Sequence, residues 1–358
     1  MKALFLYTEL APYVVACMQR LASDHGVDVH VVRWPVNAEA PFELGLGAGI
    51  TVYDRRDMDT AALLRTVTAI APDIAFVSGW VDKGYLKAAR ALRRKGATVV
   101  LCSDTAWRGG PKQWVAVAAA RVLFPRLFSH AWVTGEAQRR YALNLGFKAA
   151  NVHTGFYSAD TAPFLAAGER VLRERTGTWP HRLLCVARYI PTKNQQLLCD
   201  AFAELCNEGA AGDWALDLVG TGELFVQVST SPSGRHARIR HLGFVQADDL
   251  TGLMHRYGAF VLPSTYEPWG VVVHEQACAA QPLLLSDAVG ARERFLQEGM
   301  NGHLFRVADK ADLKRALRML IDASDADLRR MAAHSMALGG QWSPGAWAAC
   351  AYRLMTKS

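Results

Sequence analysis

Short runs of apolar and β-branched residues alternate along the first half of the chain with longer segments whose apolar positions recur every three or four residues. The short runs predict strands and the longer segments predict helices. Such an alternation predicts a parallel sheet that is covered on both faces. The expected strands are residues 3–7, 27–33, 74–78, 98–103 and 131–134, and the expected helices are residues 14–23, 60–71, 83–95 and 135–145.

A second alternation of the same kind follows residues 155–164, which we interpret as a linker because they show no strong period and contain Pro163 near their end. The pattern predicts two doubly wound α/β domains, residues 1–160 and 165–340, with ligands at the carboxyl ends of the strands and in the cleft between the halves. The expected strands of the second domain are residues 182–187, 214–219, 239–243, 259–262 and 283–286, and its helices are residues 194–207, 248–257, 271–280, 311–323 and 325–338.

Composition supports a globular enzyme, since 51% of the 358 residues are hydrophobic and 20% are charged. The apolar run at the N-terminus ends at Thr8, and no stretch of about 18 apolar residues occurs, so we expect neither a signal peptide nor a membrane-spanning helix. The seven cysteines form no C-x-x-C pair, which favours reduced thiols in a cytoplasmic protein. No histidine spacing is typical of a metal site, so no metal is expected.

Positive charge is concentrated in the first domain, where residues 1–160 hold 19 Lys and Arg against 13 Asp and Glu. Within it, residues 111–128 form a basic amphipathic segment of the kind that binds an anionic bilayer. Packing between domains is the alternative for its apolar residues. We expect a cytoplasmic protein that is peripheral on the inner face of the membrane. The basic residues concerned are Lys112, Arg121 and Arg126 in the segment, and Arg90, Arg93, Arg94 and Lys95 before it.

The most informative chemistry lies in residues 263–275. The strand 259–262 stops at Pro263, a polar loop follows, and Gly270 opens a helix in which Glu275 stands eight positions after Glu267. Glu275 lies about 8 Å along the helix axis from Gly270. The helix N-terminus attracts an anion such as a diphosphate, and the two carboxylates can accept hydrogen bonds from hydroxyls on either side of it. A diphosphate between two polyols is a nucleotide sugar.

With Pro-Ser before it, Pro-Trp-Gly inside it and Glu-Gln-Ala after it, this segment resembles the signature of GT-B glycosyltransferases, and of family 4 in particular. The resemblance implies two Rossmann-like domains facing a central cleft, with the terminal helix, residues 343–358, crossing back to the first domain. It further implies that Glu275 binds the ribose and that Glu267 contacts the sugar in catalysis. A solvated loop glutamate followed by a helix-surface glutamate is the alternative. Further donor contacts are implied for Trp269, Gly270 and Val271.

Other segments of residues 183–306 extend the resemblance. Arg188 and Lys193 follow a predicted strand and resemble a Gly-Arg-x-x-x-x-Lys-Gly element, whose cations stabilise the departing diphosphate. We expect these cations to replace Mg²⁺, so that no cofactor or metal is needed; a surface pair beside a turn is the alternative. Segments 219–223 and 241–245 resemble donor-binding elements near the diphosphate and the base, which implies roles for Gly220, Gly222, Phe244 and Val245.

The chain departs from the family pattern at three places. Ala187 and Asn194 stand where Gly is usual, and Ala280 with Gln281 replaces an Ala-x-Gly pattern. None of these changes removes a charged group, so we expect activity to be retained. Gly290 and Gly302 are expected at turn positions with positive φ.

The acceptor side is less defined, because residues 8–13 lack the Gly-Gly loop that many family members carry after the first strand. Asp104 follows the predicted strand 98–103, so its carboxylate is our candidate for contacting an acceptor hydroxyl or supporting its deprotonation. A helix cap or a turn is the alternative role for Asp104.

Taken together, the residues and the resemblance predict a retaining, metal-independent glycosyltransferase that moves a sugar from a nucleotide diphosphate sugar to a lipid-linked saccharide in polysaccharide or glycolipid synthesis of the cell envelope. Retention comes from the resemblance alone. The alternatives are a nucleotide-sugar epimerase of related fold, a transferase with a small soluble acceptor, a pyridoxal-phosphate phosphorylase and a non-catalytic nucleotide-sugar-binding partner. Nucleic acid is not an expected ligand, because no recognisable module for it is present.

Overall fold

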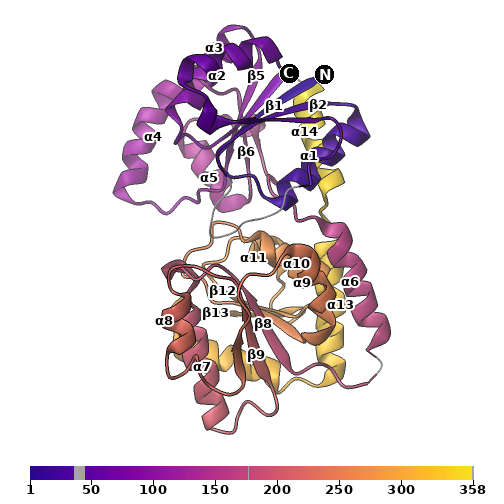
Figure 1. Ribbon diagram of the computed structural model, residues 1–358. Coiled ribbons are helices and arrows are strands. Elements are labelled where there is room, and N and C mark those ends of the chain that lie inside the picture. The colour runs from indigo at the N-terminus through magenta and orange to yellow at the C-terminus, as the bar shows by residue number, and fades with distance from the viewer. Residues whose placement is uncertain (36–44, 176, 357–358) are drawn as a thin grey trace. The chain divides into compact units, whose positions relative to one another are not determined.

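The computed structural model describes residues 1–35, 45–175 and 177–356, and the chain divides into two compact units. The first unit comprises Met1–Asp160 and Ser343–Ser358, and the second comprises Thr161–Trp342. Each unit contains one parallel sheet with helices packed against it (Figure 1). The doubly wound α/β class predicted from the hydrophobic pattern is confirmed.

The sheet of the first unit has seven strands in the order β3-β2-β1-β4-β5-β6-β7, and every pair is parallel. Its central strands are near-continuous apolar runs, as expected where helices cover both faces. Residues 3–6 and 74–77 are completely buried. The strands are β1 Lys2–Tyr7, β2 Asp28–Arg33, β3 Ile50–Asp54, β4 Ile74–Ser78, β5 Thr98–Ser103, β6 His130–Val133 and β7 Val152–His153.

The helices of the first unit return the chain from the carboxyl edge of the sheet to its amino edge. Asp59 and Asp82 cap the second and third helices with side-chain carboxylates, which satisfies first-turn N–H groups. The helices are α1 Pro12–His25, α2 Thr60–Ile70, α3 Lys83–Arg94, α4 Pro111–Leu123, α5 Glu136–Asn144 and α14 Pro344–Thr356, with short 3₁₀ turns at Arg55–Asp57, Phe124–Arg126 and Ala149–Asn151.

Helix α14 belongs to the first unit although it ends the chain, and it packs along α1. Its buried residues include Trp347, Ala351 and Leu354. The indole Nε1 of Trp347 donates to the carbonyl oxygen of Phe156 at 2.6 Å, and its ring lies 4.8 Å from that of Trp132. The terminal helix is therefore an integral part of the core of the first unit.

The sheet of the second unit has six parallel strands in the order β10-β9-β8-β11-β12-β13. They are β8 Arg182–Val186, β9 Ala215–Val219, β10 Ile239–His241, β11 Ala259–Leu262, β12 Leu283–Ser286 and β13 Gly302–Phe305. The helices around it are α6 Thr161–Glu174, α7 Gln195–Asn207, α8 Phe225–Thr230, α9 Ala247–Leu253, α10 Val271–Cys278, α11 Arg292–Phe295, α12 Lys310–Ile321 and α13 Asp325–Gly339, with 3₁₀ turns at Pro191–Lys193 and Met254–Arg256.

Several elements were not predicted from the sequence. The interpretation of residues 155–164 as a linker is wrong at its end, because α6 begins at Thr161. Pro163 falls in the first turn of α6, where the missing N–H of proline costs no hydrogen bond. Strands β3, β7 and β13 were missed, since β3 is largely half-buried, β7 contains only two residues, and β13 begins with glycine and histidine in place of an apolar run.

Candidate functional site

Lys193 and Glu267 lie together at the carboxyl edge of the second sheet. Lys193 ends the 3₁₀ turn after β8, and its Nζ donates to Oε2 of Glu267 in the loop after β11. The hydroxyl of Ser264 donates to the same oxygen at 3.3 Å. The side chains of Lys193 and Glu267 are 15% and 11% exposed. A cation and a carboxylate that are 74 positions apart thus form one partly desolvated pair.

Backbone hydrogen bonds hold the loop of Glu267 from both sides. The amide of Thr265 donates to the carbonyl of Thr192 at 2.8 Å, which ties this loop to the turn that bears Lys193. On the other side, the amide of Gly290 donates to the carbonyl of Glu267 at 3.0 Å. These main-chain hydrogen bonds hold Lys193 and Glu267 next to each other. They do not depend on which side chains the neighbouring loop residues carry.

Helix α10 begins directly after this loop and has no side-chain cap. Its N-cap is Gly270, with a φ of 94°, and a β-carbon at that position would lie 3.0 Å from Cγ of Glu267. The first-turn N–H groups, beginning at Val271, therefore open beside Glu267 without a capping side chain between them, which is the arrangement that attracts an anion. Glu275 lies half-buried in the same helix.

Trp269, a predicted donor contact, lies in the core. Its residue surface is only 3% exposed, and its ring meets that of Phe295 edge to face at 6.5 Å. The carbonyl of Trp269 accepts from the amide of Ala291 at 2.8 Å. Trp269 thus holds the loop against the core of the second unit, and its buried indole has almost no surface that a ligand could contact.

The loop that carries Arg188 is braced by a glutamine that sequence reasoning missed. The side-chain amide of Gln195, which is 2% exposed, donates to the carbonyls of Arg188 at 2.8 Å and Ala187 at 3.3 Å. Asn194 lies between Lys193 and this glutamine with a φ of 56°. Asparagine adopts this left-handed conformation more readily than most residues, which explains why it can stand where Gly is usual.

The two glycines of the 219–223 turn are required by close backbone packing. A β-carbon on Gly220 would lie 2.1 Å from the carbonyl oxygen of Ala187, and one on Gly222 would lie 2.6 Å from that of Tyr189. The φ angles are 132° and 148°. These glycines let the turn press against the loop of Arg188, so their first role is to position that loop.

The 241–245 segment is held by a histidine and a tyrosine. Nδ1 of His241 accepts from the hydroxyl of Tyr189 at 2.7 Å, and Nε2 donates to the carbonyl of Gly234 at 3.1 Å. Burial lowers the pKa of His241, which favours this neutral form. Phe244 and Val245 follow in a half-buried loop. Nothing in the sequence pattern pointed to this pairing.

Of the two glycines expected to have a positive φ, one has it and the other does not. Gly302 has a φ of 156° and thus the expected positive sign. Gly290 is not among the residues with positive φ, so that expectation is wrong; its β-carbon would instead lie 2.2 Å from the carbonyl of Pro268. Ala280, where a glycine pattern is usual, adopts a left-handed φ of 56°.

The described part of the chain shows no group of three or more His, Cys, Asp or Glu residues arranged to hold a metal ion. It also shows no helix that is long and apolar enough to cross a membrane.

In the first unit, Asp104 follows β5 at the carboxyl edge of the sheet. Its Oδ2 accepts from the hydroxyl of Tyr157 at 3.4 Å, and its carbonyl accepts from the side chain of Gln138 at 3.1 Å. Burial, and then the charges around it including Asp104, raise the pKa of Tyr157 well above its ordinary value, so the phenol stays protonated as a donor. The next helix, α4, has Gly110 as its N-cap, so Asp104 is not a helix cap.

Helix α4 buries one face and exposes an apolar one. Val117 and Ala120 are buried, whereas Trp114, Val115 and Val122 are 59%, 72% and 61% exposed. At 100° per residue, the exposed face consists of residues 111, 114, 115, 118, 119 and 122, and all of these are apolar. Lys112 and Arg121 flank this strip on its two sides. The described residues of the first unit leave it uncovered. We define these six residues as the α4 strip.

Comparison with known proteins shows that the second unit is similar to a family of glycosyl transferases. Residues 180–323 match the family model described as glycosyl transferases group 1. Over 130 residues the chain is 32% identical to a glycogen synthase of Mycobacterium tuberculosis, which covers 35% of this chain and 28% of that protein. It is 27% identical over 186 residues to an alpha-D-kanosaminyltransferase of Streptomyces kanamyceticus, covering 51% and 46%. The chain thus spans less than half the length of these relatives.

Solved structures show the same fold over the whole chain. HepE of Anabaena, in complex with UDP and glucose, matches 100% of both chains with a TM-score of 0.74 at 18% identity. TarM of S. aureus, as a mutant in complex with Fondaparinux, alpha-GlcNAc-glycerol and UDP, matches 99% of this chain and 100% of its own with a TM-score of 0.73 at 10% identity. The expected GT-B fold class is confirmed, and residues 180–323 are similar to the group 1 glycosyl transferases.

Proposed function

We propose that this chain is a retaining, metal-independent glycosyltransferase that moves a sugar from a nucleotide diphosphate sugar to a lipid-linked saccharide. The observation that carries the proposal is the Lys193–Glu267 pair beside the uncapped N-terminus of α10. A cation, a carboxylate and a helix N-terminus at one sheet edge provide separate partners for a phosphate and for a sugar hydroxyl.

Lys193 and Arg188 stabilise the departing nucleoside diphosphate in this proposal. Breaking the bond between the sugar and the diphosphate leaves negative charge on the phosphate oxygens, and fixed donors aimed at that charge lower the barrier. Gln195 holds the backbone of Arg188, and the glycine turn holds the same loop from the other side. Because these cations neutralise the diphosphate, turnover should persist in the presence of a chelator.

The two glutamates divide the donor between them. Glu275 lies within α10, about 8 Å from its start, so its carboxylate would accept from the ribose hydroxyls while the first turn binds the diphosphate. Glu267 precedes that turn and would accept from a hydroxyl of the sugar. Its contact with Lys193 would keep the carboxylate oriented next to the leaving group.

On the acceptor side, Asp104 would accept the hydrogen of the attacking hydroxyl. Tyr157 donates to Oδ2 of Asp104, and this contact would orient the carboxylate as an acceptor for the incoming hydroxyl. The α4 strip and the positive charge of the first unit support an acceptor carried by lipid at an anionic surface. TarM, a structural neighbour, was solved with a saccharide and UDP, which is consistent with a saccharide acceptor here.

A thermal-shift screen against UDP, GDP and ADP sugars, followed by product analysis with a lipid extract, tests the proposal. A bound donor at about 100 times its Kd adds about 2.7 kcal/mol to the free energy of unfolding. We expect stabilisation by one of these donors and transfer of its sugar to extractable lipid. Transfer only to water-soluble saccharides would replace the lipid acceptor, and conversion of the donor without any acceptor would indicate an epimerase.

A further inference from the structure

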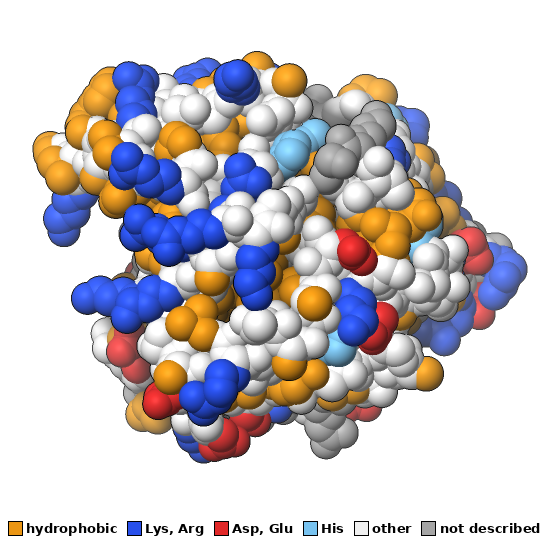
Figure 2. All heavy atoms as spheres, turned by 90° about the horizontal axis from the view of Figure 1, so that it is seen from above, with side chains coloured by type: hydrophobic (Ala, Val, Ile, Leu, Met, Phe, Trp, Pro, Cys, Tyr) orange, Lys and Arg blue, Asp and Glu red, His pale blue; other side chains and the backbone are white. Residues whose placement is uncertain are grey.

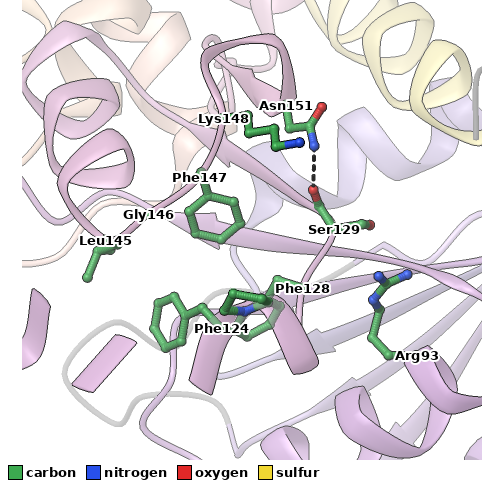
Figure 3. A pocket seen from close by; sticks show the side chains of 10 residues that line it. Arg93, Phe124, Phe128, Ser129, Leu145, Gly146, Phe147, Lys148 and Asn151 are labelled. Carbon is green, nitrogen blue, oxygen red and sulfur yellow. Dashed lines mark hydrogen bonds between the residues drawn. The ribbon is translucent and has the colours of Figure 1, made fainter. Parts of the chain in front are cut away.

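A cavity of about 290 Å³ opens at the amino edge of the first sheet (Figure 3). Phe124, Phe128 and Phe147 form its apolar wall, and Arg93 and Lys148 add two cations. These side chains come from the end of α3, from the 3₁₀ turn after α4 and from the loop after α5. A cavity with aromatic walls and two cations suits an anionic group that is joined to an apolar body.

The cavity lies at the opposite sheet edge from Asp104. Ser129, which lines it, immediately precedes β6, whereas Asp104 immediately follows β5. Helix α4 connects the two edges, since it starts seven residues after Asp104 and ends one residue before Phe124. Its 13 residues span about 20 Å. The α4 strip therefore runs from the sheet edge of Asp104 to the cavity. A flat membrane surface that contacts the strip would reach both of these places.

Around the cavity the charge is of one sign. Segments 86–96, 111–130 and 144–153 contain five, three and one Lys or Arg residues, and none of them contains Asp or Glu. Figure 2 shows Lys and Arg side chains gathered with hydrophobic ones toward the upper left of the view, on the side where α4 lies in Figure 1. An anionic surface would be attracted to this region.

The cations of the cavity have no carboxylate partner among the described residues. Arg93 donates from Nη1 to the carbonyl of Ala97 at 3.3 Å, and neither it nor Lys148 forms an ion pair within the described chain. Nε of Arg93 is buried without a hydrogen-bond partner there. Burial, and then the charge of Arg93, lower the pKa of neighbouring His130, which favours the neutral form of this histidine.

We propose that this cavity binds the phosphate group of an anionic phospholipid, with Arg93 and Lys148 as its partners and the α4 strip lying in the interfacial layer of the bilayer. The inference deepens the proposed function, because it rests on the membrane placement of the acceptor. A phosphate beside Arg93 and Lys148 would accept charge-assisted hydrogen bonds, which are about twice as strong as bonds between neutral groups.

The continuity of the apolar surface favours a lipid over a soluble phosphate ester. Val122 and Leu123, which are 61% and 51% exposed, lead directly into Phe124 and Pro125 of the cavity wall. If Arg93 and Lys148 bind the phosphate of a phospholipid, the acyl chains of that lipid can therefore lie along this surface. A soluble phosphate would use the two cations but would leave the exposed strip unexplained.

Flotation of the full chain with phosphatidylcholine vesicles, with and without phosphatidylglycerol, tests the proposal. Three variants are compared with the parent: Arg93→Ala with Lys148→Ala, the uncharged change Phe147→Ala, and the control Arg20→Ala with Arg65→Ala, which removes the same charge elsewhere in the first unit. We expect binding only to vesicles with phosphatidylglycerol. The cavity pair should weaken it about tenfold or more, Phe147→Ala about fivefold, and the control less than about twofold.

Equal losses in the cavity pair and the control pair would overturn the proposal, because the attraction would then be diffuse. Strong binding of glycerol phosphate in solution without vesicle binding would also overturn it, since the ligand would be a soluble ester. Melting temperatures of all variants exclude misfolding as the cause of a loss. Nucleotide-sugar binding is measured in parallel: its absence from the parent chain would refute the donor site while leaving the vesicle result to stand alone.

Discussion

The donor edge of the second unit and the acceptor edge of the first are built in different ways. At the donor edge, the loops touch through their backbones, and Gly220, Gly222 and Gly290 leave no space for a β-carbon. Near the acceptor edge, Gly79 and Gly109 have open space around that position. Its chemistry lies in side chains such as Asp104 and Tyr157, and beside it lies the exposed α4 strip. The comparison teaches that close main-chain packing holds the proposed donor side chains in place, whereas the proposed acceptor side depends on side chains that can be replaced without disturbing the backbone.

The largest effect should come from adding one methyl group at the donor edge. Gly220→Ala places a β-carbon 2.1 Å from a carbonyl oxygen at a φ of 132°, so we expect it to lower the free energy of unfolding by about 3 kcal/mol or more. Gly109→Ala, at a φ of 72° with open space, should cost about 1 kcal/mol. Denaturant titration measures both. Similar losses at the two sites would remove the distinction between the edges.

Loss of one donor-site cation should have a nearly equal effect in free energy, but on turnover and not on the stability of the fold. We expect Lys193→Ala and Arg188→Ala each to lower kcat by about a hundredfold or more, because each removes a group that stabilises the departing diphosphate. Lys310→Ala provides the control, since Lys310 pairs with Glu204 on the surface of the same unit. Near-normal kcat in both donor-site variants, with intact folding, would remove these residues from the chemistry.

A milder change is expected on the acceptor side. Tyr157→Phe deletes the hydroxyl that donates to Asp104, and a single hydrogen bond of this kind is worth about 1 kcal/mol, or about fivefold in kcat/KM for the acceptor. Affinity for the donor should not change, because Tyr157 belongs to the first unit. Tyr53→Phe, which alters another tyrosine of that unit, is the matched control. A loss of donor affinity in Tyr157→Phe would contradict the assignment of this edge to the acceptor.

The smallest effect is expected at Asn194, whose φ is 56°. Asn194→Ala should lower the free energy of unfolding by about 1 kcal/mol, because alanine lacks the tolerance of asparagine for the left-handed region. Asn194→Gly should change it by less than about 0.5 kcal/mol, since glycine adopts the conformation freely but loses more entropy on folding. Thermal unfolding distinguishes them. A stabilising Ala variant would show that the backbone of this loop is not constrained.

These differences explain which features could be predicted from the sequence. The strands and helices around both cores follow from apolar periodicity, and the position of Glu275 about 8 Å along its helix from Gly270 follows from helix geometry. The turn glycines were noticed as a motif, but the reason for them is the approach of Ala187 and Tyr189, which lie more than 30 positions away. Contacts over such separations leave no local period in the sequence.

The elements that sequence reasoning missed share a physical cause. Gln195 braces the Arg188 loop through backbone carbonyls, and Tyr189 orients His241, and neither contact follows a spacing rule. Trp269 was expected to contact the donor but packs on Phe295, because a large aromatic ring gains more from burial beneath the loop. The sequence does not predict helix α6, because residues 155–164 show no strong period and contain Pro163, although proline is tolerated in a first turn.

The central claim is that Glu275 binds the nucleotide and Glu267 binds the sugar at one donor edge. Calorimetric titration of Glu275→Gln and Glu267→Gln, each with the free nucleoside diphosphate and with the corresponding nucleotide sugar, tests it most directly. We predict that Glu275→Gln weakens both ligands about tenfold, because the ribose contact is common to them. Glu267→Gln should weaken only the nucleotide sugar. If Glu267→Gln weakens both ligands and Glu275→Gln only the sugar donor, the two carboxylates have the opposite roles and the account is contradicted.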